Sequence, residues 1–107
     1  METIENIRDF INNEQIALLY LTTTDCNVCK VLKPKIQDIC CEFELVKDKY
    51  IDIDDLPELK GEFSVFAAPT MILFIEGKET LRFSRNIDLY DFRQKLERYV
   101  DLLTSEI

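Results

Sequence analysis

The apolar positions at the start of the chain predict an amphipathic helix followed by a buried strand. Within residues 3–12, isoleucine and phenylalanine recur at the spacing of one helix face, and the hydroxyl of Thr3 is placed to cap the helix. Residues 15–21 form a mostly apolar run of strand length, which is typical of a strand buried on both faces. The polar residues 22–25 then predict a loop.

A second helix is predicted over residues 26–43, where apolar side chains form a single stripe. The stripe consists of Val28, Leu32, Ile36, Ile39 and Phe43. Asp25 immediately precedes this segment, and its carboxylate is expected to cap the helix. Pro34 lies inside the helix, lacks a backbone N–H and is therefore expected to kink it.

The rest of the chain predicts three more strands and two more helices. Strands are expected over residues 45–53, 71–75 and 80–84, and the last two form a hairpin. A short helix or irregular segment is expected over residues 55–64, and a final helix over residues 89–103. This order of elements places the chain in the α/β class, with a mixed sheet that has helices on both faces.

Length and charge narrow the function classes. The chain has 107 residues, which predicts one domain over residues 1–107. Its formal net charge of −8 argues against binding to nucleic acid or to anionic membrane surfaces. The longest apolar run, residues 16–21, is too short to cross a bilayer. The acidic N-terminus lacks the pattern of a secretory signal, so a cytoplasmic location is predicted.

The chain contains no histidine, and this removes several kinds of catalysis. Serine–histidine and cysteine–histidine nucleophile pairs, histidine metal sites and the usual general base near neutral pH are excluded. Any chemistry must therefore come from thiols or carboxylates. The chain has four cysteines, which in a reducing compartment are catalytic, metal-binding or inert more often than they form structural disulfides.

Cys26 and Cys29 are the residues best placed to carry chemistry. They follow a predicted strand and loop and open a predicted helix, where unpaired N–H groups and the helix dipole favour a thiolate. The two-residue spacer allows one cysteine to attack a mixed disulfide formed at the other. We interpret Cys26, which is expected to face solvent, as the nucleophile and Cys29 as the resolving thiol.

The other interpretations of the cysteines are a zinc site and a structural role. Zinc would need two further ligands, yet about 16 Å of helix separates Cys29 from Cys40. Cys40 and Cys41 are adjacent in the helix, so their side chains point in different directions and cannot both bind one zinc ion. We therefore predict no metal and no other cofactor. Cys40 is expected in the core, and Cys41 on the outer face, where it can form an intermolecular disulfide.

The dithiol and several other features together resemble the thioredoxin family. In chain order these features are Cys26-Asn27-Val28-Cys29-Lys30, Pro34, Tyr50-Ile51-Asp52-Ile53-Asp54, Ala68-Pro69-Thr70, the apolar strand 71–74 and Gly77. The resemblance extends from about residue 15 to the end of the chain. Each feature is weak alone, and the set in this order is specific.

The resemblance implies a thioredoxin fold and a thiol–disulfide oxidoreductase that reduces protein disulfides. It makes Cys26 the attacking thiolate, Cys29 the resolving thiol and Pro69 a cis-proline that faces them. Ala68, Pro69 and Thr70 would form the substrate-binding segment. The implied partners are disulfide-containing proteins and a recycling reductase such as a thioredoxin reductase, and a monomer is expected. Because the N-terminus is short by one strand, we expect a sheet of four strands rather than five.

The chain departs from the family pattern beside the dithiol. Asp25 precedes the first cysteine in place of an aromatic residue, and Asn27-Val28 replaces Gly-Pro between the cysteines. Tyr20 stands in place of a buried acid, and Tyr50 in place of the lysine that pairs with it. Ser84-Arg85-Asn86 replaces a glycine after the last strand, which is expected to narrow the substrate groove.

These departures leave two functions open. The carboxylate of Asp25 repels a thiolate at Cys26 and, as a cap, competes for the same N–H groups, so the dithiol is expected to be reducing. The missing acid is expected to slow turnover, which favours as an alternative a thioredoxin-fold binding or redox-sensing module. Tyr20 and Tyr50 either replace the proton relay or fill its space as core aromatics.

Overall fold

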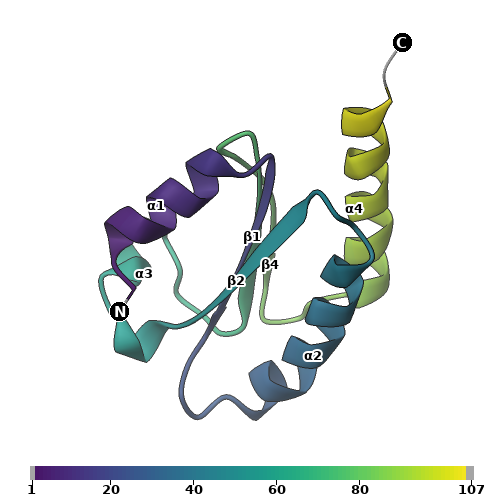
Figure 1. Ribbon diagram of the computed structural model, residues 1–107. Coiled ribbons are helices and arrows are strands. Elements are labelled where there is room, and N and C mark those ends of the chain that lie inside the picture. Colours follow the sequence, from purple (N-terminus) through teal and green to yellow (C-terminus); the bar gives the residue numbers. More distant parts are fainter. Residues whose placement is uncertain (1, 106–107) are drawn as a thin grey trace.

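The structure is a computed structural model that describes residues 2–105, and its elements follow the predicted order (Figure 1). The helices are α1 (Ile4–Asn13), α2 (Asn27–Cys41), α3 (Leu59–Glu62) and α4 (Leu89–Thr104), with a 3₁₀ turn η1 (Ile53–Asp55). The strands are β1 (Ile16–Thr22), β2 (Val46–Asp52), β3 (Thr70–Ile75) and β4 (Lys78–Ser84). Among residues 2–105, every helix is too short or too polar to cross a lipid bilayer.

The strands form one mixed sheet in the order β2-β1-β3-β4. β1 pairs in parallel with β2 and antiparallel with β3, so it has a hydrogen-bonded neighbour on each side. β3 and β4 are the antiparallel strands of a hairpin. The expectation of a mixed sheet of four strands is confirmed for the described part of the chain.

Helices cover both faces of this sheet and enclose two apolar clusters. α1 and α3 lie on one face, and α2 and α4 lie on the other (Figure 1). Side chains of β1 alternate between the two clusters. The cluster under α1 receives Ala17, Leu19 and Leu21. The cluster under α2 receives Ile16, Leu18 and Tyr20. All of them are fully buried, which explains the uninterrupted apolar run in the sequence.

The cap predicted for the first helix is confirmed, although the helix lies one residue later than predicted, and the predicted end of the second helix is wrong. Thr3 caps α1 as predicted, because its Oγ1 accepts a hydrogen bond of 3.0 Å from the backbone N–H of Asn6. The helix predicted over residues 26–43 ends earlier, at Cys41. There the N–H of Glu42 bonds to a carbonyl only three residues back, which tightens the last turn and stops the helix.

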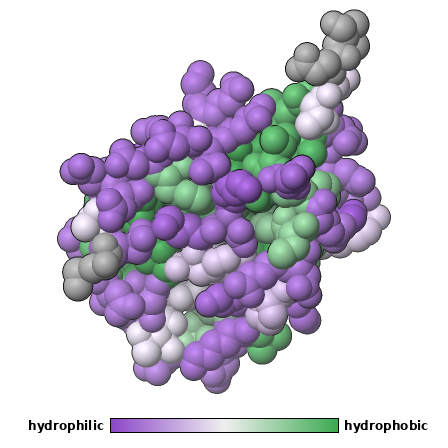
Figure 2. Space-filling view, viewed as in Figure 1, coloured by the Kyte–Doolittle hydropathy of each residue, from purple (hydrophilic) through white to green (hydrophobic). Residues whose placement is uncertain are grey.

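The surface is mainly hydrophilic, in keeping with the net charge of −8. On the face shown in Figure 2, apolar surface is confined to separate patches within hydrophilic surroundings. Several large apolar side chains are nevertheless exposed, among them Val28, Val31 and Phe66. Val28 lies between the two cysteines of the motif, and Phe66 lies close to the predicted substrate-binding segment. These two are therefore of interest for substrate contact.

The β3–β4 hairpin is closed by a two-residue turn, so β4 begins before the predicted residue 80. Glu76 and Gly77 lie between the paired residues Ile75 and Lys78, and they have positive φ angles of 51° and 83°. This is the pattern of a type I′ turn, whose twist matches that of the two strands. A Cβ atom at Gly77 would lie 3.1 Å from Oδ1 of Asn12.

Gly77→Ala is expected to lower the free energy of unfolding by about 1 to 2 kcal/mol, because an L side chain is strained at this φ. Gly61→Ala is the matched control, since Gly61 lies in α3 and no atom lies within 4 Å of a Cβ there. The control is expected to leave stability unchanged or to raise it by up to about 1 kcal/mol. Urea denaturation measures both changes, and equal stability of the two variants would contradict this account of the turn.

Candidate active site

The two cysteines of the motif lie at the start of α2 and form a disulfide whose Cα atoms are 5.2 Å apart. Cys29 is buried, with 2 % of its surface exposed. Cys26 is half-buried and ends the loop that follows β1. A second protein can therefore reach the sulfur of Cys26 more easily than that of Cys29.

The expectation that Asp25 caps α2 is wrong. The capping group is the sulfur of Cys26, which accepts a hydrogen bond of 3.1 Å from the backbone N–H of Cys29. The physical reason is the starting point of the helix. Its first residue is Asn27, so Cys26 occupies the position from which a side chain reaches the third N–H of the helix. Asp25 lies one residue further out and is exposed.

This position favours negative charge on Cys26 once the disulfide is reduced. The sulfur faces N–H groups that have no partner within the helix, and it lies at the positive end of a helix of 15 residues. Both effects stabilise a thiolate. Of the two opposing effects expected from Asp25, competition for the cap is absent, and charge repulsion remains.

The segment before β3 carries the predicted substrate-binding residues. The peptide bond between Ala68 and Pro69 is cis, as the family resemblance implies. Ala68 is half-buried and packs in the same apolar cluster as the two cysteines. Pro69 and Thr70 are buried, and the Thr70 hydroxyl donates a hydrogen bond of 2.7 Å to the carbonyl oxygen of Ala67. The segment therefore lies against the apolar cluster that includes both cysteines, and Ala68 is the most accessible of the three.

Tyr20, in β1, is the residue that stands in place of the expected buried acid. It is fully buried, and its hydroxyl donates a hydrogen bond of 2.9 Å to the carbonyl oxygen of Cys29. Burial raises the pKa of Tyr20 to about 12. The hydroxyl therefore stays protonated at neutral pH, and its hydrogen bond goes to the backbone. Of the two interpretations of Tyr20, the geometry favours a core residue that also attaches α2 to the sheet.

Tyr50, in β2, packs edge-on against Tyr20, with 5.7 Å between the ring centroids. Its hydroxyl donates a hydrogen bond to the carboxylate of Asp48. Burial and this hydrogen bond raise the pKa of Tyr50 above its ordinary value. The ammonium of Lys33 lies 5.4 Å from the ring centroid. Tyr50 therefore also stays protonated near neutral pH, and it offers no base to the cysteines.

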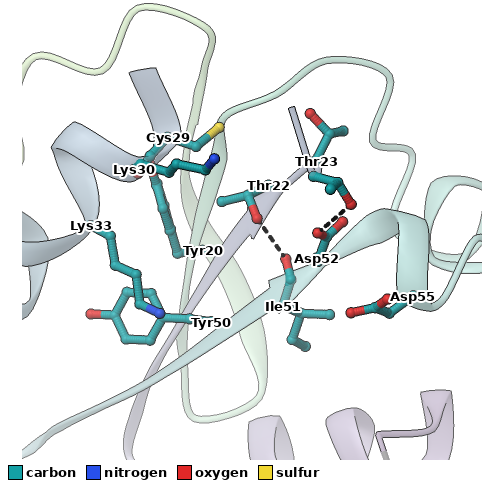
Figure 3. A pocket seen from close by; sticks show the side chains of 11 residues that line it. Tyr20, Thr22, Thr23, Cys29, Lys30, Lys33, Tyr50, Ile51, Asp52 and Asp55 are labelled. Atoms are coloured by element: carbon teal, nitrogen blue, oxygen red, sulfur yellow. Dashed lines mark hydrogen bonds between the residues drawn. The ribbon is translucent and has the colours of Figure 1, made fainter. Parts of the chain in front are cut away.

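A hollow of about 350 Å³ lies beside Cys29 and is lined largely by polar side chains (Figure 3). Lys30 and Lys33 of α2 line it on one side, and Asp52 and Asp55 line it on the side of β2 and η1. No sequence pattern assigns a role in the site to these four side chains. Each is an ordinary charged residue in the sequence, and the hollow forms only when two distant segments meet. Solvent in this hollow can approach Cys29.

Hydrogen bonds to the end of β2 fix the loop that carries the first cysteine. The backbone N–H of Thr24 donates to the carboxylate of Asp54 over 2.9 Å, and its hydroxyl donates to Asp52 over 2.8 Å. The bonds from Thr24 hold the pKa of Asp54 below its ordinary value. The loop after β1 is therefore held at a defined place beside η1.

The other two cysteines lie as predicted, with Cys40 buried and Cys41 exposed. Burial, with smaller contributions from the charges of Asp48 and Cys41, raises the pKa of the Cys40 thiol to about 12. This thiol is consequently unreactive at neutral pH. Within residues 2–105, no three cysteine, aspartate or glutamate side chains gather in a way that can hold a metal ion.

Tyr20→Phe is expected to lower the free energy of unfolding by about 1 kcal/mol, because it deletes a buried hydrogen bond and keeps the ring. Tyr90→Phe is the matched control, since Tyr90 is 72 % exposed and its hydroxyl accepts a hydrogen bond from Gln94 at the surface. The control is expected to change stability by less than about 0.5 kcal/mol. Chemical denaturation distinguishes the two, and equal effects would contradict the role given to the Tyr20 hydroxyl.

High pH is expected to destabilise the fold through Tyr20. Its pKa is about 12 in the folded protein and 10.0 ordinarily, so the unfolded chain loses this proton first. The contribution of Tyr20 to the free energy of unfolding is therefore undiminished below pH 10.0 and is lost as the pH rises from 10.0 to about 12. Tyr20→Phe is expected to show a smaller fall in stability, because the contribution of Tyr20 is then absent while Cys40 and Tyr50, whose pKa values are also raised, still contribute. Denaturation at a series of pH values measures this, and an identical pH dependence would refute it.

Comparisons with known proteins agree with this architecture. A protein-family profile described as Thioredoxin matches residues 1–98. Thioredoxin-like protein YdfQ of Bacillus subtilis (strain 168) is 32% identical over 106 residues, which are 99% of this chain and 95% of that protein. Thioredoxin 1 from Thermosipho africanus TCF52B has a TM-score of 0.74 and 31% identity, over 80% of this chain and 96% of that one. Thioredoxin from Trypanosoma brucei brucei has a TM-score of 0.84 and 24% identity, over 94% of this chain and 88% of that one.

These similarities extend over nearly the whole chain and include the region of the dithiol. The mixed sheet of four strands with helices on both faces is the thioredoxin fold. The disulfide at the start of α2 has the spacing and position that the sequence motif predicted. The chain belongs to the thioredoxin family, and it carries the CxxC disulfide of that family at Cys26 and Cys29.

Proposed function

We propose that the protein is a thiol–disulfide oxidoreductase that reduces disulfide bonds in protein substrates. The observation that carries the proposal is the position of Cys26. Its sulfur caps α2, is accessible to solvent, and lies 3.1 Å from the N–H of its partner Cys29. This arrangement provides an activated nucleophile and a resolving thiol within one helical turn.

The reaction has two exchange steps. The thiolate of Cys26 attacks one sulfur of the substrate disulfide, so that a Cys26–substrate disulfide forms and the other substrate sulfur leaves as a thiolate and takes up a proton. Cys29 then loses its proton, and its thiolate attacks the sulfur of Cys26. The Cys26–Cys29 bond forms, and the second substrate thiolate leaves and is protonated. Two electrons have passed from the dithiol to the substrate.

The proton of Cys29 leaves through solvent in this mechanism. Tyr20 and Tyr50 occupy the places that the family resemblance gives to a buried acid and its lysine partner. Both tyrosines stay protonated near neutral pH, because burial raises their pKa values, so neither can accept the proton. The hollow beside Cys29 supplies space for water and is lined by the charged side chains described above. We therefore assign the role of proton acceptor to water in this hollow.

Ala68, Pro69 and Thr70 are proposed to place the substrate beside the dithiol. Ala68 is partly exposed and belongs to the apolar cluster that includes both cysteines, and with the exposed Phe66 it lines one hollow of the surface. Thr70 is buried and bonds to Ala67, so we assign it to shaping the segment rather than touching substrate. Pro69 is also buried and fixes the direction of the chain here.

The oxidised protein needs a supply of two electrons and two protons to return to the dithiol. A separate reductase of the thioredoxin reductase class is the proposed donor, as the family membership implies. The chain itself is proposed to need no cofactor. Its proposed substrates are disulfide-containing proteins, and it is proposed to act as a monomer in the cytoplasm.

A binding or redox-sensing module is the second candidate function, and Tyr20 is the observation that favours it. A residue that cannot accept a proton near neutral pH occupies the place expected for an ionisable acid. If resolution by Cys29 is slow for this reason, the disulfide would form without efficient turnover. Steady-state turnover therefore separates the two candidates.

Cys26→Ser is expected to abolish reduction of insulin in the presence of dithiothreitol, because it removes the nucleophile. Cys29→Ser is expected to accumulate a mixed disulfide with insulin that dithiothreitol releases, because the resolving thiol is missing. Cys41→Ser is the matched control, since Cys41 is an exposed cysteine of the same helix outside the motif. Undiminished activity of Cys26→Ser would show that the dithiol is not the site.

The reduction potential of the Cys26–Cys29 pair is expected to be near or below about −270 mV, the value typical of a reducing thioredoxin. The charge of Asp25 disfavours the reduced thiolate and so favours the disulfide. Equilibration with glutathione, followed by quantification of thiols, measures the potential. A value close to that of strong oxidants, about −120 mV, would contradict a reducing role, and a low potential without turnover would favour the sensing module.

A further inference from the structure

Arg85, just after β4, has a backbone conformation that usually belongs to glycine. Its φ angle is 68°, in the left-handed region that side chains other than glycine seldom adopt. Such strain persists where the surrounding structure enforces it, and it is often associated with function. The conformation is enforced here, because the backbone N–H of Arg85 donates a hydrogen bond of 2.8 Å to the carbonyl oxygen of Pro69.

This hydrogen bond places Arg85 next to the segment proposed to hold the substrate. Thr70 of β3 also pairs with Ser84 of β4, so the residues that adjoin Pro69 and Arg85 in the chain lie side by side as well. Arg85 also lines a hollow of about 310 Å³ together with Val28 and Leu32 of α2. Val28 lies between the two cysteines in the sequence, so the hollow reaches the segment that carries the dithiol.

The charge of Arg85 is available to a ligand. Three other arginines are bound to glutamates, in the pairs Arg8–Glu62, Arg82–Glu79 and Arg93–Glu42. Arg85 is exposed, and within residues 2–105 its guanidinium has no ion-pair or hydrogen-bond partner. The chain has 21 acidic and 13 basic side chains, so a cation without an acidic partner is notable at this hollow.

We propose that Arg85 and Val28 form a subsite that binds an acidic side chain of the substrate polypeptide close to its disulfide. The subsite rests on the proposed function and adds substrate selectivity to it. A guanidinium binds a carboxylate through two parallel hydrogen bonds, and the exposed side chain of Val28 covers the aliphatic part of a glutamate.

Two carboxylates near the subsite, Asp88 and Asp25, affect where in the substrate sequence an acidic side chain is preferred. Asp88 lines the same hollow, but it accepts a hydrogen bond of 3.0 Å from the N–H of Asp91 at the start of α4, where the helix dipole offsets its charge. Asp25, exposed and adjacent to Cys26, repels acidic groups on its own side. The preference for acid therefore depends on where the acidic side chain stands relative to the substrate cysteine.

The test uses single-cysteine peptides activated as 2-pyridyl disulfides, with Glu or Gln at each position from three before the cysteine to three after it. The protein carries Cys41→Ser in every measurement, because the exposed thiol of Cys41 would also react with these peptides. Attack by Cys26 on the peptide sulfur then releases pyridine-2-thione, which is neutral and is followed by its absorbance. The reduced protein is expected to react about two- to five-fold faster with Glu than with Gln at one or two adjacent positions, the size of an exposed ion pair. Added salt is expected to weaken this preference.

Arg85→Gln is expected to remove the preference, and Arg85→Gly is expected to remove it while raising the midpoint of unfolding, because glycine relieves the strained φ. Arg85→Lys is expected to keep part of it. Arg98→Gln is the matched control, because it makes the same change in net charge on the exposed face of α4, in a different region of the surface. This control is expected to keep the full preference.

Two outcomes would overturn the subsite, and they differ from failure of the proposed function. Equal rates for Glu and Gln at every position, or a preference that survives in Arg85→Gln, would refute the subsite while Cys26 still reacts. Absence of pyridine-2-thione release from every peptide, with Gln peptides included, would instead refute the proposed function.

Discussion

The central position of β1 in the sheet is the constraint on which the rest of the structure depends. It has hydrogen-bonded neighbours on both sides, and every side chain from Ile16 to Leu21 is buried. Because these side chains alternate between the two apolar clusters, β1 determines which helices cover which face. The strand ends at the loop that carries Cys26, and Tyr20 bonds to the backbone of Cys29. A shift by one residue would exchange the two clusters and break this contact.

The loop that carries Cys26 and the segment at Pro69 are each held by contacts to another part of the chain. The loop after β1 is held by Asp52 and Asp54, and the segment at Pro69 is held by Arg85 from beyond β4. The sheet and α2 form the scaffold, while Cys26 and the residues proposed to place the substrate lie in or next to loops. This arrangement keeps the sulfur of Cys26 accessible and fixes what surrounds it.

The interior beside the second cysteine differs in character from what the family resemblance implies. Two tyrosines occupy the places of an acid and a lysine, and burial keeps both tyrosines protonated near neutral pH. The Tyr20 hydroxyl donates a hydrogen bond to the carbonyl oxygen of Cys29, and the Tyr50 hydroxyl donates one to the carboxylate of Asp48. Both tyrosines therefore contribute to stability and to the position of neighbouring groups rather than to proton transfer. Charged groups lie instead at the surface, among them Asp25 beside Cys26 in the chain and Arg85 beside Pro69.

The sequence by itself determined the order of the elements and the location of the dithiol, because these depend on local periodicity and on the spacing of Cys26 and Cys29 within one turn. Only the tertiary structure decided which group caps α2, what the hydroxyl of Tyr20 contacts, and that Arg85 stands beside Pro69. Each of these contacts depends on the exact start of a helix or joins segments that lie apart in the chain. Local propensity cannot specify such contacts, because packing of the sheet and helices alone brings those segments together.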